Sequence, residues 1–118
     1  MDIGSAVGRT KGIGWDKLAA IEGFRESDLF SAAEQAALAY TEEMCRIPVE
    51  VPDAIFEELA RWFDDRAIVE LTATVALENL RARFNRALQV PSDNLCILPA
   101  AHRASTAAAA GESSPAAK

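Results

Sequence analysis

The stretch DDRAIVELTATVALENLRARFNRAL, residues 64–88, decides the fold because it predicts one long helix. The aspartates at its start are typical helix caps, and we expect the helix to run from about Asp65 to Leu88. Its apolar residues form two stripes rather than one. Two stripes indicate a helix that is covered on more than one side, as a central or an interface helix would be. The first stripe is Ile68, Leu71 and Val75, and the second is Ala76, Leu80, Phe84 and Leu88.

Polar residues alternate with apolar ones near the end of this helix, in ENLRARFNRAL at residues 78–88. Glu78 and Arg81 are three residues apart, which suits an ion pair on one helix face. Two interpretations of the other polar residues stay open. They form an ordinary solvated face, or Asn79, Arg83 and Asn85 make hydrogen bonds inside the fold or across a subunit contact.

Working back along the chain, further helices are predicted by their start signals. Ser31 and Glu34 form a capping box ahead of a helix from about Ala32 to Arg46, with Phe30 at the staple position. The segment IPVEVP, residues 47–52, predicts an extended linker. Pro52 then suits the start of a helix whose apolar face is 3–4 spaced. This face comprises Ile55, Phe56, Leu59, Trp62 and Phe63.

The opening part of the chain predicts one more short helix, WDKLAAIEGF at residues 15–24, in which Trp15 and Leu18 share a face. Gly12 and Gly14 before it are good helix stops. Apart from PVEV, no run alternates with the period of a strand. The fold class is therefore all-α, with about five helices, in a domain of residues 1–98. The Ala- and Ser-rich residues 99–118 are expected to be a disordered tail.

Composition excludes several classes of protein. The 118 residues suffice for one modest domain, and the net charge of −6 argues against a nucleic-acid partner. No stretch approaches the length of a membrane span, and no secretory signal is recognisable, so we expect a cytoplasmic protein without a membrane partner. Cys45 and Cys96 lie too far apart for a redox pair, and we expect each to be a small buried or half-buried thiol.

Motifs of catalysis are missing from the sequence. It has no phosphate-binding loop, no GxGxxG, no metal-ligand spacing and no Ser-His-Asp arrangement. The single histidine, His102, lies in the expected tail, so the folded part offers no histidine general base. We expect no cofactor and no metal ion.

The order of segments resembles the carboxymuconolactone decarboxylase and alkylhydroperoxidase D-like family. The matching pattern is LFS..E.AAL.Y.E, then VPD..FE.L...F, then IVELT...A..N...RFN.AL, from about residue 2 to residue 90. Its most specific section runs from Ile68 to Asn85. The resemblance implies an all-helical, alkylhydroperoxidase D-like fold that assembles as homotrimers or homohexamers. It also implies architectural or interface roles for Glu70, Asn79, Arg83, Phe84 and Asn85.

The same resemblance implies thiol-dependent peroxide reduction, which many members perform with a Cys-x-x-Cys pair and a following histidine. Laid on this chain, Met1 falls one place after the second of those cysteines, and Gly4 stands at the histidine position. Cys45 and Cys96 do not match the motif. We therefore expect no catalytic residue in this chain and no peroxidase activity from it as given.

Two explanations stay open. In the first, the gene product is longer and carries the thiol pair, and MDIGSAVGRTKGIG is the rear half of its active-site helix. Only such a longer form would need a thiol reductant as partner. In the second, the chain is a non-catalytic relative that assembles or binds a small molecule; a lactone decarboxylase is a further alternative. If the front half of the domain is missing, apolar surface is expected to be exposed at Trp62–Phe63 and Leu80–Phe84, which favours association.

Overall fold

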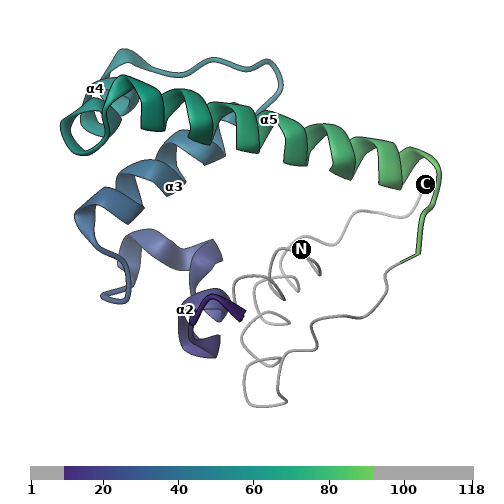
Figure 1. The fold of residues 1–118 in the computed structure, drawn as a ribbon, viewed down its shortest axis with the longest axis horizontal. Helices are drawn as coiled ribbons and strands as arrows, with labels where there is room; N and C mark the ends of the chain where they lie inside the picture. Colours follow the sequence, from purple (N-terminus) through teal and green to yellow (C-terminus); the bar gives the residue numbers. More distant parts are fainter. Residues whose placement is uncertain (1–9, 92–118) are drawn as a thin grey trace, which may run out of the picture. The chain divides into compact units, whose positions relative to one another are not determined.

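A computed structural model describes residues 10–91 of the chain. The described residues divide into two units, residues 10–23 and Phe24–Pro91. All regular structure among residues 10–91 is helical, which confirms the all-α fold class (Figure 1). Five helical elements follow one another within that part of the chain. The expectations for Gly4, Cys96, His102 and the tail lie outside it.

The first two elements are short. Helix α2, Trp15–Ala19, has Gly14 as its N-cap, and Gly12 lies just before it at φ +91°, where glycine is favoured. The prediction of one helix over residues 15–24 is wrong. The chain leaves the α-helix at Ala20 and continues as the 3₁₀ element η1, Ile21–Glu26. Gly23, at φ −106° and ψ 36°, leaves helical geometry inside η1, because glycine pays a large entropic cost in a helix.

Helix α3, Ala32–Met44, begins at the predicted capping box. The Glu34 amide donates to Ser31 Oγ at 3.2 Å, and the Ser31 amide donates to Glu34 Oε2 at 2.8 Å. Two of the amides that a helix start leaves without partners are thereby satisfied. The helix ends at Met44, two residues short of the expected end, and Cys45 is its C-cap.

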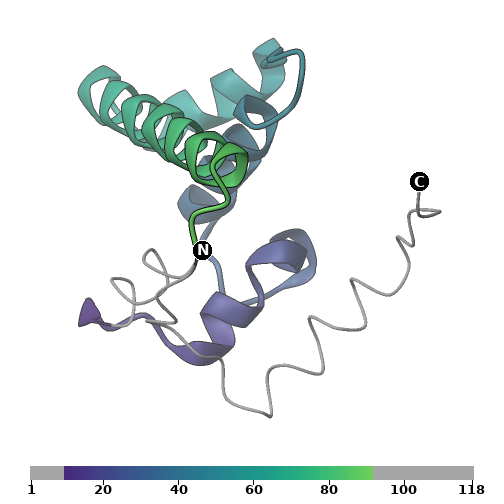
Figure 2. The same ribbon diagram turned by 90° about the vertical axis from the view of Figure 1, so that its right-hand side faces the viewer.

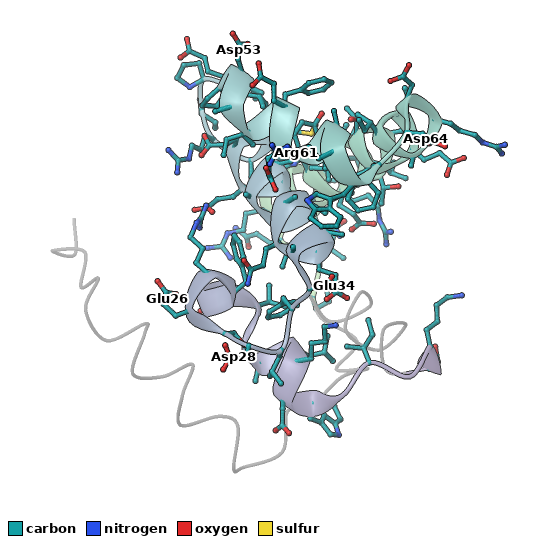
Figure 3. All side chains as sticks on the ribbon, turned by 90° about the vertical axis from the view of Figure 1, so that its left-hand side faces the viewer. Glu26, Asp28, Glu34, Asp53, Arg61 and Asp64 are labelled. Carbon is teal, nitrogen blue, oxygen red and sulfur yellow. The ribbon has the colours of Figure 1, made fainter. Side chains whose placement is uncertain are left out.

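Helices α4, Asp53–Trp62, and α5, Asp65–Ala87, match their predicted positions closely. Pro52 is the N-cap residue of α4, and Asp64 Oδ1 caps α5 by accepting from the Ala67 amide at 2.8 Å. Figure 3 shows Asp53 at the start of α4 and Asp64 at the turn into α5. A tight turn therefore joins the two helices.

The core of the second unit takes one residue from each of its helices. Tyr40 of α3, Leu59 of α4 and Ile68 of α5 form a buried cluster, and Leu59 is fully buried. Phe63 packs against this cluster, so the expectation of an exposed Phe63 is wrong, whereas Trp62 is 50% exposed. Burial of these side chains is the main stabilising contribution to a three-helix unit of this size. The other half-buried members are Ala37, Met44, Val51, Ile55 and Leu71.

Helix α5 extends beyond the two helices on which it packs (Figures 1 and 2). Residues 80–91 are exposed throughout. The helix ends in a Schellman motif, in which the Val90 amide donates to the Asn85 carbonyl and the Gln89 amide donates to the Arg86 carbonyl. Gln89 occupies the left-handed position at φ +52°. This end is defined by its own hydrogen bonds rather than by packing on a neighbouring helix.

A membrane-crossing helix would need a long, apolar stretch. None of the helices within residues 10–91 combines the length and the hydropathy for that role.

Candidate functional site

A line of polar contacts joins α3 to α5 beside the core. The Tyr40 hydroxyl lies 2.8 Å from Thr72 Oγ1, and Thr72 Oγ1 donates to the Ile68 carbonyl at 2.7 Å. A threonine hydroxyl has one proton, and here the Ile68 carbonyl takes it. The Tyr40 hydroxyl is therefore the donor in the contact with Thr72. This contact gives α3 and α5 a polar link in addition to their apolar contacts.

The second polar contact between these helices involves Asn79 and Cys45. Asn79 Nδ2 donates to the Val75 carbonyl at 3.0 Å and to Cys45 Sγ at 3.4 Å. Cys45 is exposed and unpaired, so the expectation of a buried or half-buried thiol is wrong for this residue. The reason is its position at the C-cap, where α3 ends and the last turn of the helix is open to solvent. The result is a solvent-accessible thiol held next to an amide donor.

The other predicted site residues lie on the surface of α5. Glu70 is exposed and pairs with Arg66, with 3.2 Å between Oε1 and Nε. Phe84 is 59% exposed, and its neighbours Arg83 and Asn85 are exposed too. The side chains of Arg83 and Asn85 have no hydrogen bond or ion pair with any other part of residues 10–91. Of the five predicted site residues, Asn79 therefore bonds within the folded unit, whereas the other four are exposed. These four are Glu70, Arg83, Phe84 and Asn85.

The predicted ion pair between Glu78 and Arg81 is confirmed, with 3.2 Å between Oε1 and Nη1. Other charged contacts were missed. Arg25 Nη1 lies 2.6 Å from Glu42 Oε2, while Arg46 contacts both Glu42 and Glu43. The pairs made by Arg46 have helical spacing that could have been recognised in the sequence, whereas the Arg25 pair spans seventeen residues and depends on the fold.

The chemistry available at the Cys45 and Asn79 contact is that of one thiol and one amide. Cys45 is the single cysteine of residues 10–91, so no second thiol of that part of the chain faces it. Two-thiol peroxide reduction needs a resolving cysteine to capture the sulfenic acid. Within the same residues, no three His, Cys, Asp or Glu side chains cluster as metal ligands would.

The class of protein that this arrangement defines is a small all-α unit with a protruding, partly uncovered helix. A comparison with known proteins finds a similar protein. The chain is 46% identical over 84 residues to "Uncharacterized protein YnjA" of Escherichia coli (strain K12), and the match covers 71% of this chain and 46% of that protein. The chain thus spans less than half the length of this curated relative. No family model matches the chain, and no solved structure matches it.

Proposed function

We propose that this chain is a non-catalytic, self-associating helical module that resembles the carboxymuconolactone decarboxylase and alkylhydroperoxidase D-like proteins. Its role is to form an assembly through α5, in a homotrimer or a homohexamer. Thiol peroxidase activity is proposed only for a protein in which a Cys-x-x-Cys pair accompanies these helices.

The observation that carries this proposal is the exposed apolar side of α5. Leu77, Leu80, Phe84 and Leu88 are each 55–63% exposed. Monomeric soluble proteins rarely leave large apolar residues gathered in this way, and such patches mark interaction surfaces. The section that carries the family resemblance, Ile68 to Asn85, runs through this helix, so the resemblance and the exposed surface coincide.

The proposed compartment is the cytoplasm. Cys45 is a free, exposed thiol, and thiols of this kind persist in reducing compartments. In an oxidising compartment an exposed unpaired cysteine would form mixed or intermolecular disulfides.

The non-catalytic part of the proposal is tested by peroxide consumption with a dithiol reductant. We expect the purified 118-residue chain to consume hydrogen peroxide no faster than free cysteine at the same thiol concentration. The Cys45→Ser variant is the matched control and should lower even this background. Turnover well above the free-cysteine rate would overturn the proposal, and its loss in Cys45→Ser would identify the thiol responsible.

A further inference from the structure

We propose that the outer stripe of α5, defined as Val69, Ala73, Leu77, Leu80 and Phe84, pairs antiparallel with the same stripe of a second copy of this chain. This inference rests on the proposed function, because it assumes that copies of the chain associate, and it adds how they do so. It is independent of any peroxidase chemistry. The proposal specifies which surface of α5 is used, which partner it binds and which symmetry the contact has.

The outer stripe lies directly opposite the buried side of α5. The buried-side residues Ile68, Leu71 and Val75 are each followed nine residues later by an exposed apolar residue, Leu77, Leu80 and Phe84. Nine residues correspond to about two and a half helical turns, which places the later residue on the far side of the helix. One side of α5 therefore contacts α3 and α4, and the other side carries large apolar residues that no part of residues 10–91 covers.

The charges along α5 favour a second copy as the occupant. Residues 64–70 carry three acidic side chains and one arginine, whereas residues 81–91 carry three arginines and no acid. Two antiparallel copies set the acidic start of one helix against the basic end of the other, and they also oppose the two helix dipoles favourably. A parallel pair would bring like charges together at both ends.

The register follows from the stripe itself. A twofold axis near Leu77 sets Val69 against Phe84 of the second copy and Ala73 against Leu80, so that large residues meet smaller ones. The same register brings Glu70 near Arg81 of the second copy, on the same side of the stripe. Arg83, which makes no ion pair within residues 10–91, then faces the acidic start of the second helix.

This contact discriminates between the two proposed assemblies. A twofold contact is isologous and closes as a dimer. It is compatible with a hexamer built from three dimers around a threefold axis, and it cannot by itself build a simple trimer. The pairing therefore favours the hexamer, or a dimer, over the trimer.

The surface is tested with a substitution in the stripe and a matched one outside it. We expect Leu80→Lys to weaken the association constant of the full chain by about tenfold or more, as is typical of a central interface residue. Leu29→Lys is the control, since Leu29 is 48% exposed and lies outside α5. Circular dichroism checks folding, and the milder Phe84→Ala replaces Leu80→Lys if that variant is unfolded. Association unchanged by the stripe substitution, or a wild-type chain that stays monomeric, would overturn the inference.

The antiparallel arrangement is tested by charge reversal. Glu70→Arg and Arg81→Glu each place like charges together in a self-pair, and each variant alone should associate about threefold or more weakly than the wild type. An equimolar mixture of the two restores both opposite-charge contacts, and its association should return toward the wild-type value. A mixture no stronger than its separate components would contradict this register. Peroxide turnover by the chain would overturn the non-catalytic proposal, but it would not change the association of the stripe and charge-reversal variants. Failure of the proposed function can therefore be told apart from failure of the antiparallel pairing.

Discussion

The Tyr40 hydroxyl donates to Thr72 Oγ1 across 2.8 Å, and this contact links α3 to α5 beside the buried cluster. Tyr40 is 6% exposed and its ring also meets the Phe56 ring edge-on, with 6.4 Å between centroids. Two kinds of contact therefore fix the tyrosine: its apolar ring packs in the core, and its hydroxyl forms a hydrogen bond where α3 meets α5.

Tyr40→Phe keeps the ring and removes the donor. We expect the free energy of unfolding to fall by about 1 kcal/mol, because Thr72 Oγ1 loses its hydrogen-bond donor in a half-buried position. Urea unfolding followed by circular dichroism measures this change. Thr74→Val is the control, since the Thr74 hydroxyl bonds only the Glu70 carbonyl of its own helix and is exposed. A Tyr40→Phe variant as stable as the wild type would show that the contact contributes nothing.

Leu59→Ala tests the core. Leu59 is the one fully buried large side chain among residues 10–91, and its truncation should lower the free energy of unfolding by about 2–5 kcal/mol. In a unit this small, that loss is expected to leave a large fraction of the molecules unfolded at room temperature. Val69→Ala, at a 67% exposed position, is the control and should change stability by less than about 0.5 kcal/mol in dilute solution. Equal effects of the two substitutions would contradict the assigned core.

The capping box at the start of α3 predicts a difference between two small residues. Ser31→Ala should cost about 1 kcal/mol of stability, because it leaves the Glu34 amide without its acceptor. Ser31→Gly should cost only a few tenths of a kcal/mol, since glycine is itself a tolerated N-cap. Chemical unfolding of both variants provides the comparison. The reverse order, with glycine the more harmful residue, would show that the serine does not act as a cap.

The end of α5 predicts a stabilising substitution. Gln89 has φ +52°, a region that costs a residue with a side chain about 1 kcal/mol and costs glycine almost nothing. Gln89→Gly should therefore raise the free energy of unfolding by several tenths of a kcal/mol, after allowing for the greater freedom of glycine in the unfolded chain. The measurement is a thermal or urea unfolding curve. A destabilised Gln89→Gly variant would contradict the Schellman end described for this helix.

The sequence predicted the helices that have local start signals. Ser31 with Glu34, Pro52 and Asp64 each mark a helix start through contacts within a few residues, and all three helices begin where expected. The single helix expected over residues 15–24 failed because its apolar spacing is compatible with both an α-helix and a 3₁₀ turn. Gly23 interrupts the helical geometry within this segment.

The candidate site was less accessible to sequence reasoning because its contacts are long-range. Asn79 meets Cys45 across 34 positions, and Tyr40 meets Thr72 across 32. No local pattern encodes such pairs, which depend on how α3 and α5 pack. The second apolar stripe of α5 was recognised in the sequence, but whether another helix of the same chain covers it could be decided only in three dimensions.

The most direct test of the account is the mass of the full chain in solution, measured by sedimentation equilibrium at tens of micromolar. The account predicts a species whose mass is a multiple of the 12.7 kDa chain and that dissociates on dilution. A single species of 12.7 kDa over the whole concentration range would contradict it.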